Sequence, residues 1–406
     1  MTNKKMIMLS NLEIWSLEEG KGAPSFYNTI KAYAEDGWDI TLIRPISKYR
    51  KDYKVEGCKI IEFNNGFFDY LNSIPKIRFF ARFFAHFYAT KMFIKLSEDI
   101  IINSKDVPII YAYEIFGVEA GRNLQRRYGC PFVTRFQGTI LVNYKKTFYN
   151  RIRKYPHFNA LSQKCDLVIM TDDGTKGEEI LKKLGNTSEV LFLKNGQNPV
   201  KKAFDIDKAN KEIRKKLKID YNCPILLTVS RLQNWKKVDR AILLLKEVLI
   251  DYPSTKLIIV GDGEEYDNLV ELAKKEKIKS SVLFAGSVKQ EEVWKYYSCA
   301  NIFLSLYDLS NVGNPLMEAM RYGKSIITLD NGDTKKMISN NINGILVQPD
   351  NINYISKAVI DLFNNHEKLK QLGANAKKFA ESNFWTWNDR MKFELKKVES
   401  LFKRKK

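Results

Sequence analysis

Short apolar runs alternate with helical stretches along most of this chain, and this alternation constrains the fold more than any other feature. Residues 5–9 (KMIML) and 39–43 (DITLI) are typical of buried strands, and residues 25–36 between them have a helical spacing that stops at Gly37. A strand, a helix and a second strand in this order predict a βαβ unit with parallel strands. We therefore expect an α/β protein.

The same rhythm continues in two blocks, which are separated by a charged, lysine-rich segment at residues 200–221. Further strands of the first block are predicted at residues 107–111, 131–135, 167–170 and 190–193. Strands of the second block are predicted at residues 224–230, 256–260, 282–284, 302–305, 325–329 and 344–347. Because ligands of parallel sheets bind at the carboxyl ends of the strands, two facing Rossmann-like domains place a substrate cleft between them.

We set the domain boundaries at residues 1–200 and 201–384. Residues 385–406 follow as an amphipathic helix with a basic tail.

Net charge and the cysteine and histidine counts exclude several classes of protein. The 67 lysines and arginines exceed the 47 acidic residues in this 406-residue chain, which gives a net charge of +20 and favours anionic partners. Five scattered cysteines and three histidines argue against a disulfide framework and a zinc site, and favour the cytosol. We see no signal peptide, no membrane-spanning run and no nucleic-acid-reading motif.

Residues 305–323 (SLYDLSNVGNPLMEAMRYG) are the most informative stretch for chemistry. A polar loop follows a predicted strand, and Pro315 then opens a helix. The free amides of residues 312–316, other than that of Pro315, predict an anion site suited to a diphosphate. Glu318, one turn into the helix, is placed to accept hydrogen bonds from a pair of hydroxyls. The alternative is that Glu318 only complements the helix dipole.

A basic loop follows the first strand of the second block. Arg231 and Lys236 lie five residues apart in SRLQNWKKVD, and both can converge on phosphates at the edge that carries Glu318. The alternative is a solvated basic loop. The Gly261-Asp262-Gly263 turn lacks the third glycine of a dinucleotide fingerprint, because Tyr266 stands there.

At this point the second block resembles a known family, the group 1 domain of the retaining glycosyltransferases of family 4, which have the GT-B fold. The resemblance spans about 120 residues in the family's order. It rests on Arg231-Leu232 with Lys236, and on the stretches IIVGDG (258–263), LFAG (283–286), NPLMEAMRYG (314–323) and NGILVQP (343–349).

The resemblance implies an enzyme that moves a sugar from a nucleotide diphosphate sugar to an acceptor hydroxyl, with retention of configuration and without metal or other cofactor. Arg231 and Lys236 would neutralise the leaving diphosphate, Glu318 would hold the donor ribose, and the closing helix would return to the first domain. Further donor contacts are expected at Gly20, Gly22, Val288, Ser310, Asn311, Val312, Gly313, Asn314 and Leu316.

Three positions depart from the family pattern. Ser310 stands where the family has the first of two glutamates, and Lys237 replaces the glycine after the motif lysine. In the first block, Gln137 stands in place of a histidine, and we expect it and Arg135 to lie at the acceptor side of the cleft. A catalytically degenerate partner subunit is therefore one alternative function, and a basic lipid- or nucleic-acid-binding protein is another.

The segment at residues 76–89 (KIRFFARFFAHFYA) predicts a basic, aromatic amphipathic helix. Arg78, Arg82 and His86 share one face; the other carries Phe79, Phe80, Phe83, Phe84 and Phe87. Residues 145–154 add five basic side chains. We expect peripheral attachment to an anionic inner membrane surface, a glycan or lipid-linked acceptor, and a role in bacterial cell-surface polysaccharide synthesis. For residues 76–89 the alternative is a helix whose phenylalanines pack in the core. For residues 145–154 the alternative is a solvated loop.

Overall fold

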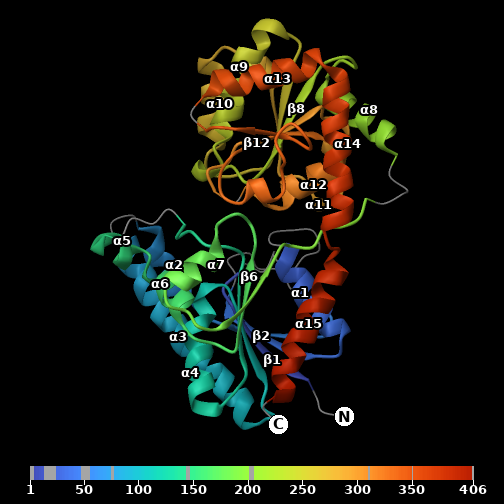
Figure 1. Ribbon diagram of the computed structural model, residues 1–406. Helices are drawn as coiled ribbons and strands as arrows, with labels where there is room; N and C mark the ends of the chain where they lie inside the picture. Colours follow the sequence, from blue (N-terminus) through green and yellow to red (C-terminus); the bar gives the residue numbers. More distant parts are fainter. Residues whose placement is uncertain are drawn as a thin grey trace. The chain divides into compact units, whose positions relative to one another are not determined.

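The computed structural model describes residues 4–12, 24–46, 55–74, 77–142, 147–200, 205–309, 311–349 and 351–404. The chain forms two compact units (Figure 1). The first unit joins residues 1–196 to residues 387–406, and the second unit contains residues 197–386. The last helix, α15 (Trp387–Arg404), therefore belongs to the first unit although it ends the chain.

The first unit is built on a seven-stranded parallel sheet in the order β3-β2-β1-β4-β5-β6-β7. Its strands are β1 (Lys5–Ser10), β2 (Asp39–Pro45), β3 (Cys58–Phe63), β4 (Ile109–Tyr113), β5 (Phe132–Phe136), β6 (Leu167–Thr171) and β7 (Glu189–Leu193). Strands that are buried on both faces read as unbroken apolar runs, and for this reason most of them were predictable from sequence.

Helices cover both faces of this sheet. Ile7 and Leu9 of β1 pack toward one layer and Met6 and Met8 toward the other, as the two-residue period of a strand requires. The first layer contains α3 (Arg78–Ile102), α4 (Val118–Tyr128), α6 (Tyr155–Ser162) and α7 (Gly177–Lys183). The second contains α1 (Pro24–Glu35) and α15. The described part of the unit also contains two shorter helices, α2 (Gly66–Ser73) and α5 (Phe148–Arg153).

The second unit has a six-stranded parallel sheet in the order β10-β9-β8-β11-β12-β13. Its strands are β8 (Ile225–Val229), β9 (Lys256–Val260), β10 (Val282–Gly286), β11 (Ile302–Ser305), β12 (Ser325–Leu329) and β13 (Ile345–Val347). This confirms the expected fold class of two Rossmann-like parallel sheets.

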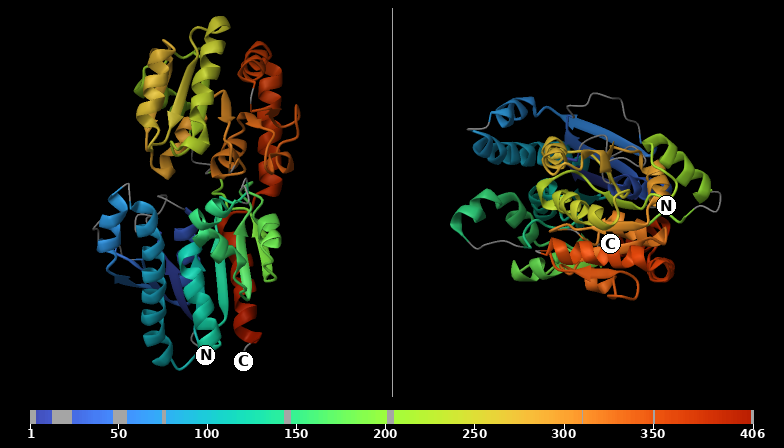
Figure 2. Two further views of the ribbon diagram at one scale, coloured as in Figure 1. Left: turned by 90° about the vertical axis from the view of Figure 1, so that its left-hand side faces the viewer. Right: turned by 90° about the horizontal axis from the view of Figure 1, so that it is seen from above.

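Two helix layers enclose this second sheet as well, and they can be followed from another side in Figure 2. One layer contains α9 (Val238–Asp251), α10 (Tyr266–Lys275) and α13 (Ile352–Asn364). The other contains α8 (Ile206–Leu217), α11 (Gln290–Cys299), α12 (Asn314–Arg321) and α14 (His366–Asn383). None of the described helices is both long and apolar enough to cross a membrane.

One strand was not predicted from the sequence. β3 (CKIIEF) lies at the edge of the first sheet, and most of its side chains stay partly exposed. Its short apolar run is interrupted by Lys59 and Glu62, so it lacks the continuous apolar pattern of the central strands.

Candidate functional site

The residues predicted to bind a donor gather at the carboxyl edge of the second sheet. Arg231 follows β8, Val288 follows β10, and the described loop residues 306–309 and 311–313 follow β11. β8 and β11 are neighbours, and the strand order reverses between them. Such a switch point is where ligands of open parallel sheets bind.

Lys236 is held between two aromatic rings at this edge. Its side chain is buried, and Nζ lies 4.3 Å from the ring centre of Trp235 and 4.2 Å from that of Tyr307. Tyr307 is fixed in turn because its hydroxyl donates to the carbonyl of Val229 over 2.9 Å. The rings attract the ammonium through cation–π contacts, so its position is set before any ligand arrives. The side chain of Arg231, in contrast, is exposed.

Glu318 lies one turn into α12, where two side chains donate to its carboxylate. Gln290 Nε2 donates over 2.7 Å and the Tyr297 hydroxyl over 3.0 Å. Burial raises the pKa of Glu318 to about 7, although both hydrogen bonds act in the opposite direction. The carboxyl group therefore changes charge near neutral pH. Sequence reasoning found Glu318 but neither partner, since both come from α11 and carry no motif.

The start of α12 leaves backbone amides available. Gly313 caps the helix, and its carbonyl accepts from the amides of Leu316 and Met317 over 3.2 and 3.3 Å. Within the part of the chain that the structure describes, the amides of Val312 and Gly313 donate no hydrogen bond. Unpaired amides at a helix N-terminus attract anions. The side chains of Val312 and Leu316 are buried in the core, so only their backbones can meet a ligand.

The side chain of Asn311 shapes this loop from within. Its Oδ1 accepts from the Tyr307 amide over 3.2 Å, its Nδ2 donates to the Tyr307 carbonyl over 2.5 Å, and it also contacts Asn331. Asp308 is tied down by Arg240, with 2.6 Å between the ion-paired atoms. The side chains of Asn311 and Asp308 are therefore held by contacts within the loop, with α9 and with Asn331, which leaves backbone groups to face a ligand.

Val288 and Asn314 are the remaining described donor candidates. Val288 is half-buried and lies two residues before Gln290, so the loop after β10 is linked to Glu318. Asn314 is the first residue of α12. The other expected contacts, Gly20, Gly22 and Ser310, lie outside the described residues.

Arg135 was expected at the acceptor side of the cleft, but its side chain is fully buried. It lies on β5 with no exposed surface, forms an ion pair with Glu394 of α15 over 3.2 Å, and contacts Thr29. This corrects the expectation that its guanidinium meets an acceptor, because it is enclosed by the core between β5 and α15. Gln137 is half-buried, and its backbone amide donates to Glu114 Oε1 over 2.8 Å.

The amphipathic segment is part of α3, and the structure corrects its expected division into faces. His86 is buried and its Nε2 lies 3.2 Å from Glu119 Oε2, so it faces the core. Phe80 and Phe84 are 62% and 57% exposed, so they face solvent. The polar histidine ring can lie inward because Glu119 of α4 supplies it with a partner. The side chains of Arg78 and Phe79 lie outside the described atoms.

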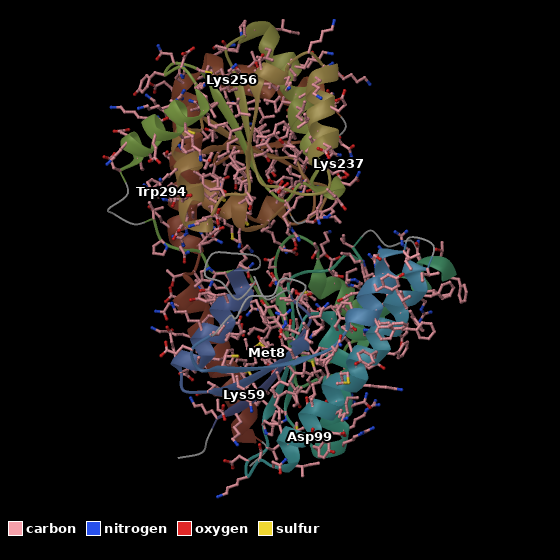
Figure 3. All side chains as sticks on the ribbon, turned by 180° about the vertical axis from the view of Figure 1, so that it is seen from behind. Met8, Lys59, Asp99, Lys237, Lys256 and Trp294 are labelled. Carbon is pink, nitrogen blue, oxygen red and sulfur yellow. The ribbon has the colours of Figure 1, made fainter. Side chains whose placement is uncertain are left out.

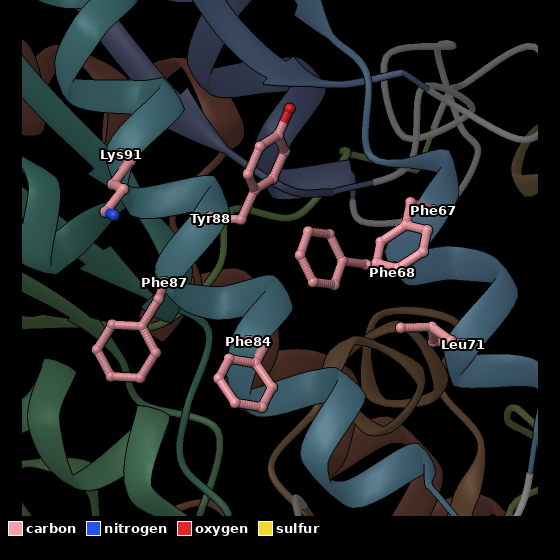
Figure 4. A pocket seen from close by; sticks show the side chains of 7 residues that line it. All are labelled: Phe67, Phe68, Leu71, Phe84, Phe87, Tyr88 and Lys91. Atoms are coloured by element: carbon pink, nitrogen blue, oxygen red, sulfur yellow. The ribbon is translucent and has the colours of Figure 1, made fainter.

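A groove lies between α2 and α3 (Figure 4). It has a volume of about 330 Å³ and is lined by Phe67, Phe68, Leu71, Phe84, Phe87, Tyr88 and Lys91. In Figure 4 the ring of Phe68 extends from α2 toward α3. Six of the seven lining residues are apolar or aromatic, and the seventh carries a positive charge.

Comparisons with known proteins agree on one family. Residues 209–379, nearly all of the second unit, match the family model for glycosyl transferases group 1. The uncharacterized glycosyltransferase MJ1069 of Methanocaldococcus jannaschii is 25% identical over 90% of each chain. The alpha-monoglucosyldiacylglycerol synthase of Streptococcus pneumoniae is 30% identical over 136 residues, which cover 34% of this chain and 31% of the synthase.

A solved structure supports the fold over the whole chain. HepE from Anabaena in complex with UDP-glucose aligns with a TM-score of 0.71 and 17% identity, over 97% of this chain and 99% of that one. At this identity the likeness shows the fold alone. Together with the family match over the second unit, it confirms the expected resemblance to glycosyl transferases group 1 and the GT-B fold.

Proposed function

We propose that this chain, a glycosyltransferase of the glycosyl transferases group 1 family, transfers a sugar from a nucleotide diphosphate sugar to an acceptor hydroxyl with retention of configuration. The observation that carries this proposal is the meeting of three kinds of group at one sheet edge. Lys236 supplies a fixed cation, α12 supplies open amides, and Glu318 supplies a carboxylate.

Each group suits one part of such a donor. Charge develops on the diphosphate as the sugar leaves, so the Lys236 ammonium and the amides of Val312 and Gly313 stabilise the transition state more than the ground state. The Glu318 carboxylate accepts hydrogen bonds from a hydroxyl pair such as that of ribose. Arg231 is exposed beside this edge and supplies a second, movable cation. Because these groups supply the charge, we expect the reaction to need no metal.

Thermal unfolding with added nucleotides tests the donor site. We would add UDP, GDP, CDP or ADP in the presence of EDTA. A nucleotide at 100 times its dissociation constant should stabilise the protein by about 2.7 kcal/mol. Lys236→Gln should weaken this effect, while Lys246→Gln removes the same charge from an exposed pair with Glu276 and should not. If no nucleotide stabilises the chain, the donor assignment is wrong and a degenerate partner subunit becomes the better reading.

We further propose that the first unit meets an anionic membrane and a lipid-linked acceptor, as a step in cell-surface polysaccharide synthesis. The support is the exposed aromatic surface of α2 and α3, which we define as Phe67, Tyr70, Phe80 and Phe84, each more than half exposed. Exposed apolar patches of this kind mark interaction sites. The exposed cations Arg82 and Lys91 on α3 favour an anionic surface.

Vesicle flotation tests the membrane proposal. The protein should float with vesicles that contain phosphatidylglycerol, and less so in high salt. Replacing Phe80 and Phe84 by serine should reduce flotation. Replacing Ile102, which is 69% exposed at the other end of α3, should not. Equal flotation of both variants would contradict a role for this surface.

A further inference from the structure

Glu114 has a backbone conformation that side chains rarely adopt. It directly follows the buried strand β4, with φ 68° and ψ 178°. This region is used almost only by glycine and costs another residue about 1–3 kcal/mol. Strain of this size persists where the surrounding structure enforces it, and it concentrates at functional sites.

Two hydrogen bonds between Glu114 and β5 or the loop that follows β5 hold this conformation. The Glu114 amide donates to the Arg135 carbonyl over 2.8 Å, and Glu114 Oε1 accepts from the Gln137 amide over 2.8 Å. The loop after β5 is joined in turn to the loop after β6, because the Thr139 amide donates to Thr175 Oγ1 over 2.9 Å. β4, β5 and β6 are adjacent, so three loops meet at the carboxyl edge of the first sheet.

This edge has little room for added atoms around Gly138. A methyl group on Gly138, whose φ is +118°, would lie 2.5 Å from the Asp173 carboxylate. Asp173 is itself engaged, because its Oδ1 accepts from the Thr175 hydroxyl over 2.6 Å. The second carboxylate oxygen of Glu114 has no hydrogen bond to a described residue, and the Glu114 side chain is only partly buried.

A purely structural role does not account for Glu114. Its one side-chain hydrogen bond goes to a backbone amide, for which water could substitute at a partly exposed edge. Desolvation by the surrounding protein also raises the pKa of Glu114 to about 7, although the Gln137 amide and the Arg135 charge act in the opposite direction. The nearby Arg135 forms its ion pair with Glu394 instead.

We propose that Glu114 Oε2 accepts a hydrogen bond from a hydroxyl of the acceptor, and that the first unit thereby binds a polyhydroxylated, sugar-like molecule at the carboxyl edge of β4. This inference rests on the proposed function. It assigns acceptor binding to Glu114, a residue that no sequence motif indicated. Glu114 then acts as a specificity and positioning residue, since a carboxylate discriminates strongly for ligands that supply a donor at that point.

The decisive variants are Glu114→Gly and Glu114→Gln. Glycine relieves the strained φ, so Glu114→Gly should unfold at the same or a higher denaturant concentration than the wild type. Both variants should bind acceptor probes about tenfold or more weakly, because a charged hydrogen bond is lost. The probes are N-acetylglucosamine and octyl β-glucoside, followed by saturation-transfer NMR.

Two controls separate this inference from the donor assignment. Nucleotide stabilisation should be equal in the wild type and both Glu114 variants; its absence from the wild type would instead overturn the proposed function. Asn341→Gly relieves another positive φ, of 60°, in the second unit and should leave probe binding unchanged. A marked loss of stability in Glu114→Gly, unchanged probe binding, or a wild type that binds neither probe would each overturn the role of Glu114.

Discussion

The carboxylate of Glu394, on the last helix, is paired with the guanidinium of Arg135, which lies 259 residues earlier on the interior strand β5. Arg390 donates to the same carboxylate over 2.6 Å, and Tyr111 donates to its other oxygen over 2.7 Å. Burial alone would raise the pKa of Glu394, but the two arginines hold it below its ordinary value. One acid is thus shared by two buried cations, and the pair with Arg135 joins α15 to the first sheet.

Removing this carboxylate should destabilise the first unit severely. Glu394→Ala leaves Arg135 and Arg390 buried without a counter-ion, which costs about 3–5 kcal/mol in comparable buried pairs. Chemical denaturation measures the loss. Glu399→Ala on the same helix is the matched control, because its partner Lys4 is partly exposed, and it should cost about 1 kcal/mol or less. Similar losses in the two variants would contradict the central role of Glu394.

A backbone contact makes Gly261 irreplaceable in the turn after β9. Its φ is +136°, and a methyl group there would lie 1.8 Å from the Ser230 carbonyl oxygen. Since both atoms belong to backbone beside adjacent strands, Gly261→Ala should cost more than about 4 kcal/mol or prevent folding. Gly286→Ala is the control: its φ is +68°, but no atom lies within 4 Å of the added methyl group. We expect it to cost about 1–2 kcal/mol, by thermal or chemical unfolding.

Lys237 replaces a glycine of the family pattern, and the backbone retains the conformation that favours glycine. Its φ is 47° and its ψ is 45°, at the cap of α9 (Figure 3). Lys237→Gly should therefore raise the free energy of unfolding by about 0.5–1 kcal/mol, after the entropy cost of glycine is subtracted. Lys274→Gly, at an exposed position inside α10, should lower it by about 1 kcal/mol. A destabilised Lys237→Gly would show that its side chain contributes more than its backbone strain costs.

The sequence was sufficient for most of the fold because buried parallel strands carry an unbroken apolar pattern. The sequence was insufficient where side chains that are far apart along the chain contact each other in the fold. Arg135 is a charged residue beside a predicted cleft, so we interpreted it as a ligand-binding residue. No sequence pattern near Arg135 indicates that its partner is Glu394. The pairing of His86 with Glu119 escaped notice for the same reason, which is why the faces of α3 were assigned wrongly.

The candidate site divides in the same way. Lys236, Glu318 and the start of α12 follow strand ends, so position along the chain was enough to bring them to one edge. Their partners Tyr307, Gln290 and Tyr297 are set by packing between elements, and only the structure places them. The role proposed for Glu114 could not be predicted from the sequence, because the property that distinguishes this residue is its backbone φ angle.

The titration of Glu318 predicts a falling stability between about pH 4.5 and 7. Its pKa is about 7 in the folded chain, above its ordinary value of 4.5, so the folded state keeps a proton that the unfolded state loses. The free energy of unfolding should therefore decrease with rising pH, by at most about 1.4 kcal/mol per unit from this group. Glu318→Gln should remove this contribution and leave a flatter profile.

Glutamine fits this site because Tyr297 has one hydroxyl proton and two acceptors within reach, Glu318 and the Pro315 carbonyl at 3.1 Å. An uncharged amide at position 318 can donate to the tyrosine oxygen, while Tyr297 donates to Pro315 and Gln290 donates to the amide oxygen. We therefore expect Glu318→Gln to fold, to be more stable than the wild type at pH 8, and to bind nucleotide more weakly there. Urea unfolding at pH 5 and pH 8 measures the difference, and parallel profiles for the two proteins would contradict the assigned titration.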